Sequence, residues 1–301
     1  MYAHFGRRRL ALAVVGVALA AGCHRAPAPL TLPPVAPVPE VVLLRLHGRV
    51  GQSRHIRIAM DNFVHLGSGE PPSGDSARPT MAMIQFVTES VTAVSGDTMT
   101  VVLVTDSSRV EMPGLSLPGG MLDSLSFRGL TTTRRIDSRG RVLAMAMKGA
   151  PRFDEAMASL GRMLPGIDTS SAASRRTVTR LPDRPVSVGE TWSDTSSMPR
   201  GLGGPGGTIV ATGRLERIET RRGRRLAVIS WDIVMPPMTL QEPMRFSSGP
   251  MHTVGELQLD LDAGWIVREA RTMTTVTHTE MGDVSMRMVM RETPVEDGAA
   301  P

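Results

Sequence analysis

The chain has few of the residues that usually make a core rigid. Cys23 is the only cysteine among 301 residues, so the fold contains no internal disulfide. Phe, Trp and Tyr together make up 3% of the residues, whereas methionine occurs 21 times. Core volume must therefore come largely from Met, Leu, Val and Ile. Because methionine is flexible and polarisable, its abundance is consistent with ordinary core filling and with an adaptable apolar surface.

The sequence also lacks the motifs of common enzyme classes. It has no Gly-x-Ser-x-Gly elbow, Ser-x-x-Lys pair, His-Glu-x-x-His motif or Walker loop. Residues 201–206 match the dinucleotide fingerprint as text, but Pro205 and the β-rich sequence after it do not supply the required helix. His47, His55 and His65 are too widely spaced on strands to predict a zinc site. We therefore expect a protein that is not an enzyme, without a cofactor.

The charge balance does not indicate a nucleic-acid partner. The chain carries 34 basic and 29 acidic residues, and Lys148 is the only lysine. Removal of residues 1–22 would take away three arginines and no acidic residue, which leaves 31 against 29. No basic patch interleaved with aromatic residues occurs. The densest run, 221–225, is typical of a solvated hairpin tip, with contact to an anionic surface as an alternative.

The N-terminus predicts export and lipidation. Three arginines, Arg7 to Arg9, precede the apolar run 10–21, which is too short to span a bilayer comfortably. The run ends in Leu-Ala-Ala-Gly-Cys, which resembles the lipobox of bacterial lipoproteins. That resemblance implies a signal peptide over residues 1–22 and a lipid on Cys23. An ordinary secretory signal with an incidental cysteine is the alternative, although an exported protein with one unused thiol would be unusual.

A proline-rich segment follows the cysteine. Residues 23–39 contain six prolines, so this segment is extended, semi-rigid and unable to pack a core. At about 3.1 Å per residue it would reach roughly 50 Å from the bilayer. Residue 24 is His rather than Asp, which by resemblance to lipoprotein sorting implies the outer membrane, facing the periplasm.

Residues 40–292 predict a mainly β domain, followed by a polar tail over 293–301. Hairpin turns at Gly96 and Asp137 have counterparts at Gly223 and Asp262, about 125 residues later. This spacing predicts two similar halves, about 40–150 and 177–292. Chance alignment of common hairpins would produce the same match.

One amphipathic helix is predicted between the halves, over residues 151–164. Pro151 suits a first helical position, and apolar residues recur on one face. We expect this helix to pack on the inner face of a curved, largely antiparallel sheet or half-barrel of about ten or more strands, an α+β arrangement.

The central stretch Leu181-Pro-Asp-Arg-Pro-Val-Ser-Val-Gly-Glu-Thr-Trp192 predicts an extended segment, a turn at Gly189 and a tryptophan that enters a strand. Trp192 and Trp265 both follow turn signals, and we expect both to be buried. With the lipobox and the tether, this stretch resembles a family of uncharacterised bacterial lipoproteins. The architecture is distantly similar to lipoprotein-carrier half-barrels, which hold acyl chains, and that similarity is architectural only.

These features predict a membrane-anchored, non-catalytic protein that binds a hydrophobic or lipid-like ligand or a protein partner. Two apolar loops would bound the ligand space or pack down as lids, unless the domain is a flat, fully packed sandwich. Alternating methionines, such as Met286, Met288 and Met290, leave Cu(I)-type binding as an alternative. A hydrolase is a third hypothesis. The candidate ligand-binding residues in the two loops are Leu115, Leu117, Met121, Met238, Leu240 and Met244.

Overall fold

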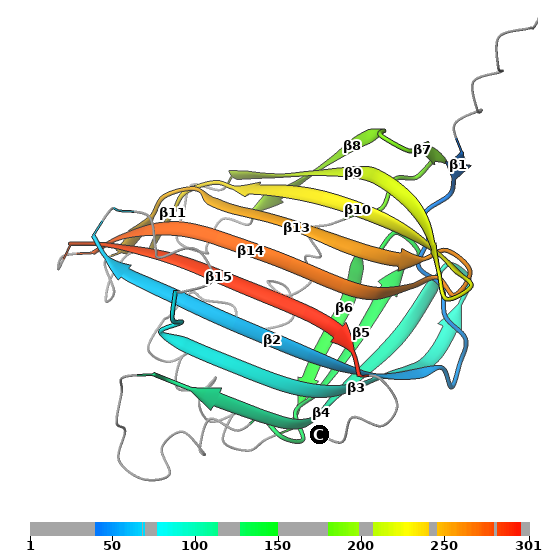
Figure 1. The fold of residues 1–301 in the computed structure, drawn as a ribbon, viewed down its shortest axis with the longest axis horizontal. Coiled ribbons are helices and arrows are strands. Elements are labelled where there is room, and N and C mark those ends of the chain that lie inside the picture. The colour runs from blue at the N-terminus through cyan, green and yellow to red at the C-terminus, as the bar shows by residue number, and fades with distance from the viewer. Residues whose placement is uncertain are drawn as a thin grey trace, which may run out of the picture. The chain divides into compact units, whose positions relative to one another are not determined.

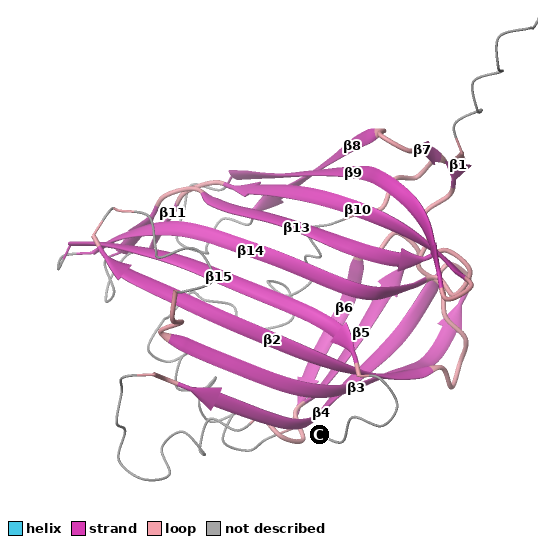
Figure 2. Cartoon of the chain, in the orientation of Figure 1, coloured by secondary structure: helices cyan, strands magenta, loops and turns pink. Residues whose placement is uncertain are grey.

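A computed structural model describes residues 40–67, 69, 77–113, 127–149, 180–198, 207–240, 246–279 and 282–295. All of them belong to one compact unit, Pro39–Pro301. They form fifteen strands and, within these ranges, no helix (Figure 2). The expected helix over 151–164 lies outside the described residues, so the described fold is all-β rather than α+β. No helix in the described ranges is long and apolar enough to cross a membrane.

The principal sheet has thirteen strands and curves strongly (Figure 1). Its main path runs β6-β5-β4-β3-β2-β15-β14-β13-β10-β9-β8, and every pairing between these strands is antiparallel. The expected curved, antiparallel sheet of ten or more strands is confirmed. Two short strands, β11 (Met238–Leu240) and β12 (Phe246–Ser248), branch from β14.

Two antiparallel meanders make up this path. The first meander consists of β2 (Ser53–Leu66), β3 (Met81–Ser95), β4 (Thr98–Glu111), β5 (Thr131–Asp137) and β6 (Val142–Lys148). The second consists of β8 (Thr191–Met198), β9 (Gly207–Arg221), β10 (Arg224–Met235), β13 (Met251–Asp260), β14 (Trp265–Thr279) and β15 (Gly282–Pro294). They join where β15 pairs with β2 along its length. The predicted duplication stays a prediction, but both halves have the meander form that it requires.

β15 runs slightly further than the sequence predicts. The strand ends at Pro294, and the backbone N–H of Val295 donates to the His55 carbonyl at 2.9 Å. The expected polar tail therefore begins after these residues rather than at residue 293.

A small two-stranded sheet and its flanking segments close one end of the curved sheet. β1 (Val41–Val42) pairs with β7 (Val186–Ser187). The adjoining backbone bonds to hairpin turns of both meanders: Leu46 N–H donates to the Ser138 carbonyl at 2.7 Å, and His47 N–H donates to the Gly264 carbonyl at 2.9 Å. Leu44 and Val186 are completely buried there. The end of the sheet is thus sealed by apolar side chains from two distant parts of the chain.

The central stretch of the sequence belongs to this seal. Leu181 is buried, and Gly189 has a φ of 86°, which permits the predicted turn. Trp192 is half-buried, and its indole N–H donates to the Arg180 carbonyl at 2.8 Å. Trp265 is 6% exposed. The expectation of burial is confirmed for Trp265 and met only partly by Trp192.

Tryptophans lie across glycines on the inner face of the second meander. Trp192 is opposite Gly213, and Trp231 is opposite both Gly213 and Gly255. A Cβ at Gly255 would lie 2.4 Å from the Trp231 ring, and one at Gly213 would lie 2.5 Å from the Trp192 ring. The absence of a side chain at these two positions lets each ring lie flat on the neighbouring strand.

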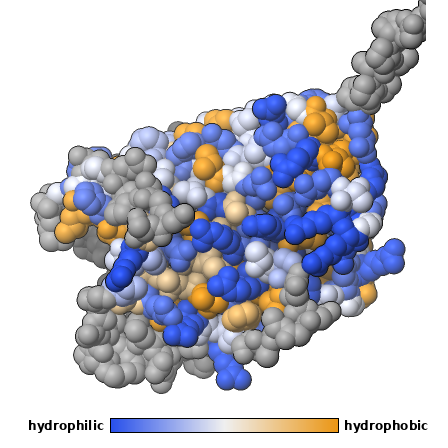
Figure 3. Space-filling model, in the orientation of Figure 1, coloured by the Kyte–Doolittle hydropathy of each residue, from blue (hydrophilic) through white to orange (hydrophobic). Residues whose placement is uncertain are grey.

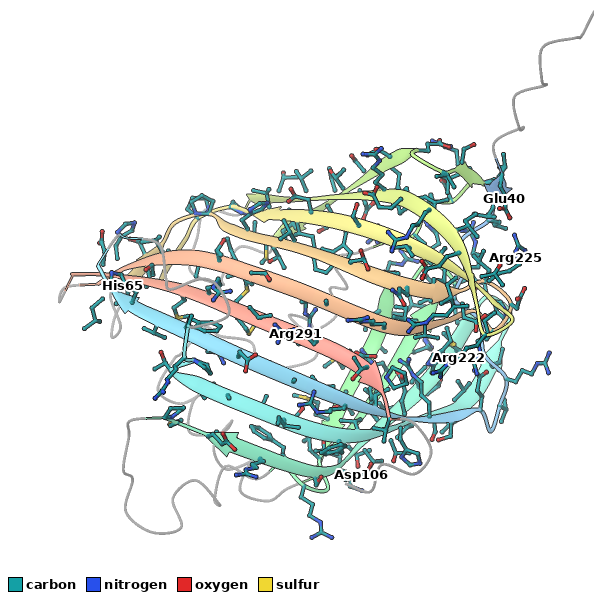
Figure 4. The ribbon with its side chains drawn as sticks, in the orientation of Figure 1. Glu40, His65, Asp106, Arg222, Arg225 and Arg291 are labelled. Carbon is teal, nitrogen blue, oxygen red and sulfur yellow. The ribbon has the colours of Figure 1, made fainter. Side chains whose placement is uncertain are left out.

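The outer face is predominantly hydrophilic in the view of Figure 3. Arg291 pairs with Asp61 at 3.0 Å, and Arg225 pairs with Glu40 beside β1 (Figure 4). The arginine run 221–225 forms the predicted hairpin tip between β9 and β10. Polar outer and apolar inner positions alternate along the strands, so the interior of the curve is where a site can form.

Candidate functional site: the inner-face cavity

The inner face of the curved sheet contains a cavity of about 690 Å³. Nine strands of the two meanders contribute to its walls, together with Leu46 and Leu181 from the sealed end. Ligand sites commonly have volumes of about 300–1,000 Å³ and mostly apolar walls. The cavity is therefore large enough for a small amphiphile or a substantial part of a lipid.

Methionines are prominent in the cavity walls. Two of them, Met273 on β14 and Met288 on β15, lie directly opposite each other in the register. Trp231 and Trp265 add two indole rings from the second meander. Among the residues that the structure describes, six methionines line the cavity: Met99, Met145, Met235, Met273, Met288 and Met290. Unbranched thioether side chains can repack around ligands of different shape, which rigid aliphatic walls cannot do as easily.

An ionic network lies on the inner face of the sheet. Arg54 on β2 pairs with Glu89 on β3 and, at 3.0 Å, with Glu292 on β15. Arg134 on β5 reaches the other oxygen of Glu89 at 3.2 Å. The Arg54 guanidinium also lies 5.0 Å from the centre of the Trp265 ring, and donates to the Ile266 carbonyl. The network therefore connects the two meanders across their junction.

Burial alters the protonation of one member of this network. Desolvation raises the pKa of Glu292 above its ordinary value, although the nearby Arg54 guanidinium favours the ionised form. The carboxylates of Glu89 and Glu269 act in the same direction as desolvation. The ionised form of Glu292 is thus disfavoured at this site.

The described residues do not assemble a recognisable catalytic centre. The hydroxyl of Thr88 donates to Asp106 at 2.7 Å and lies 3.0 Å from Nδ1 of His55. A catalytic triad places histidine between the nucleophile and the acid, whereas here the hydroxyl is central and the group is exposed on the outer face. The described ranges also contain no group of three or more His, Cys, Asp or Glu residues able to hold a metal ion.

The candidate ligand-binding residues from the sequence lie outside the part of the structure whose side chains are described. Leu115, Leu117, Met121 and Met244 lie outside the described residues, as does Cys23. Met238 and Leu240 are the ends of β11, and their side chains are not described. The role of these six residues in ligand binding therefore stays a prediction, and the described part of the cavity wall comes mainly from other strands.

Sequence reasoning missed the ionic network, although a local signal was present. Arg54 precedes Ile56 and Ile58 at two-residue spacing, and Glu89 lies between Val87 and Val91 in the same way. Each charge therefore occupies an apolar face of an alternating strand. Such a charge has to find a partner, and only the strand order shows that Arg54 and Glu89 are neighbours.

Comparison with known proteins adds little to this geometry. No family model matches the chain, and no curated protein matches it. A lipovitellin structure described for its lipid–protein interactions is similar at 10% identity and a TM-score of 0.39, covering 85% of this chain and 26% of that chain. This chain thus spans about a quarter of the lipovitellin chain. A protein of unknown function from the DUF3598 family of Nostoc punctiforme gives 12% identity and a TM-score of 0.12, covering 82% of this chain and 96% of that one.

Similarities at these scores carry no argument about function. The expected membership of an uncharacterised bacterial lipoprotein family stays a prediction, and the function has to be argued from the cavity itself.

Proposed function

We propose that this protein is a lipid-anchored envelope protein that binds a hydrophobic or lipid-like ligand in the inner-face cavity without transforming it. The observation that supports this most directly is the cavity of about 690 Å³ lined by six methionines. Removing an acyl chain from water is favourable by about 25 cal/mol for each Å² of apolar surface buried. The curved wall supports a cavity-forming domain over a flat, fully packed sandwich.

Ligand binding can be tested by filling the cavity. Met273 and Met288 are register partners on the adjacent strands β14 and β15 and both line the cavity, so the double substitution Met273→Trp/Met288→Trp should fill ligand space next to the inner face. Thr272→Trp is the matched control, because residue 272 precedes Met273 on β14 and points to the outer face. Delipidated protein would be titrated with a fluorescent fatty-acid analogue, and folding verified by circular dichroism.

We expect saturable binding by the wild type and the control, and affinity reduced at least about tenfold in the double variant. Absence of binding by folded, delipidated wild type would contradict the proposal and would favour a role in binding a protein partner. Native mass spectrometry of protein purified from its own envelope would show a retained ligand directly.

Soft-metal binding is the second candidate, and one feature of the register favours it. Met290 lies opposite Met60, and Met60 lies opposite Met83, so three thioethers occupy adjacent strands on one face. Neighbouring strands are about 4.8 Å apart, and thioethers are suitable Cu(I) ligands. Competition with a Cu(I) chelator would test this. Binding abolished by Met60→Leu would support the site, whereas binding unaffected by that change would exclude it.

The anchor is tested separately. Cys23→Ser removes the thiol that the lipobox resemblance predicts to be lipidated. We expect the variant to be released from membranes into the soluble envelope fraction, with ligand binding unchanged. Continued membrane association after fractionation would contradict lipidation at this residue.

A further inference from the structure

The cavity walls carry more positive than negative groups. Three glutamates line the cavity, namely Glu89, Glu269 and Glu292. Four arginines do so, namely Arg54, Arg134, Arg139 and Arg271. No aspartate, lysine or histidine belongs to the described lining. These described lining residues therefore have a formal balance of one positive charge even with all three carboxyl groups ionised, and the raised pKa of Glu292 can only increase it.

The accessible charge is more one-sided than this balance. The side chains of Glu89, Glu292 and Glu269 are 7%, 17% and 19% exposed. The side chains of Arg134 and Arg271 are 35% and 39% exposed. A ligand that enters the cavity thus meets guanidinium groups before it meets carboxylates.

The buried polar atoms of the described walls that lack a partner are also donors rather than acceptors. Four buried atoms of the lining residues have no hydrogen-bond partner within the described part of the chain: Nε of Arg134, Nε of Arg271, and Nε1 of Trp231 and Trp265. All four carry N–H donors. A surplus of donors in an apolar cavity favours a ligand that brings oxygen acceptors.

We infer that the ligand is an anionic amphiphile whose carboxylate or phosphate oxygens accept hydrogen bonds from Arg134, while its chain lies along the methionine wall. The inference rests on the proposed lipid-binding function and specifies the ligand class. Arg134 uses one terminal nitrogen on Glu89, which leaves the rest of its planar guanidinium for a second anion. Arg271, next to Met290 in the register, adds a second positive charge to the cavity.

The test compares ligands that share one chain and differ only in the head group. Wild-type protein would be titrated with a long-chain fatty acid, the corresponding alkyl phosphate, fatty alcohol and fatty amine at constant ionic strength. We expect either anion to bind roughly tenfold or more tightly than the alcohol, and the amine to bind weakest. The two anionic arms distinguish a carboxylate head group from a phosphate. Inorganic phosphate should not displace the bound amphiphile, because it lacks the chain.

Matched variants locate the head group. Arg134→Gln should remove the preference for the anion over the alcohol, and circular dichroism would verify that the variant is folded. Arg271→Gln should reduce the preference less. Arg135→Gln is the control, because Arg135 is the next residue on β5 and is exposed on the outer face.

Equal binding of acid and alcohol by the wild type, tightest binding of the amine, or an anion preference that survives Arg134→Gln would overturn the inference while leaving lipid binding intact. Displacement of the amphiphile by inorganic phosphate would overturn the amphiphile class. If none of the four ligands bound, the proposed function itself would be rejected.

Discussion

The two meanders each hold a hairpin turn with a buried aspartate, but the turns and the residues that follow them differ. In the first, Oδ1 of Asp137 accepts hydrogen bonds from the backbone of Arg139 at 3.0 Å and Arg141 at 2.8 Å. In the second, Oδ1 of Asp260 accepts from Asp262 at 3.0 Å and Ala263 at 2.9 Å. Each hairpin also has a register shift shortly outside the turn, at 135–136 and at 258–259. A buried aspartate thus holds each turn by satisfying backbone donors.

The residue that follows the turn glycine differs between the two meanders in charge and in burial. Gly140 is followed by Arg141, a half-exposed side chain that pairs with Asp137 at 3.0 Å. Gly264 is followed by Trp265, a buried ring that lies beneath Arg54 and lines the cavity. The position after the turn glycine therefore holds an exposed charged side chain in one half and a ring that lines the cavity in the other. Both turns belong to antiparallel meanders, and the side chains around them decide what each meander contributes to the cavity.

The largest expected effect comes from substituting the residue that follows the glycine in each turn. Trp265→Ala should lower the free energy of unfolding by about 3–5 kcal/mol, because it removes a buried ring and leaves a cavity. Arg141→Ala at the matched position should lower it by less than about 1 kcal/mol, since its ion pair is half-exposed. Urea denaturation of both variants would measure this. Similar losses of unfolding free energy in the two variants would contradict this expected difference.

The shared aspartates should have intermediate and similar effects. Asp260→Ala and Asp137→Ala each remove an acceptor from two backbone N–H groups, at about 1–3 kcal/mol for a buried donor left unsatisfied. We expect Asp260→Ala to cost more, because Asp260 is 2% exposed and Asp137 is 8% exposed. Denaturant midpoints would rank the two. A negligible effect of both changes would show that water replaces the carboxylate in each turn.

Substitution of the glycines that lie opposite tryptophans in the second meander should have a smaller effect. Gly255→Ala should destabilise by about 1–3 kcal/mol, because its Cβ would meet the Trp231 ring and, at 2.7 Å, the Ala270 carbonyl. Gly213→Ala should cost less, since Trp192 is half-buried and its ring can move. Thermal unfolding would measure the difference. A larger loss at Gly213 would indicate that the Trp192 ring is the more tightly held.

The smallest expected effect is a change in pH dependence. Burial raises the pKa of Glu292 above 4.5, so the native carboxyl binds its proton more tightly than the unfolded one. The contribution of this group to stability is therefore full below pH 4.5 and decreases as the pH rises through the raised pKa. Relative to Glu292→Gln, the wild type should lose stability over this interval. Parallel stability curves for the two proteins would contradict the raised pKa.

Local patterns predicted the hairpins well, whereas the candidate ligand contacts in the loops stay a prediction. Gly96, Asp137 and Gly223 marked turns correctly, because turn chemistry depends on a few neighbouring residues. Candidate ligand contacts such as Met121 were selected because their loops are rich in apolar residues. No other feature of the sequence distinguished these loops. The observed lining is spread over residues 46–292, so its members are brought together by strand order.

The sequence by itself determined that the chain is rich in antiparallel strands with alternating faces, that it has no disulfide, and that methionine replaces aromatic core volume. Those properties depend on composition and on contacts between near neighbours. The tertiary structure alone decided that β2 pairs with β15, because that contact joins residues more than 200 positions apart. This pairing brings Arg54 between Glu89 and Glu292, and with it the charge of the cavity. Charge partners across a sheet depend on strand order and register, which no local pattern specifies.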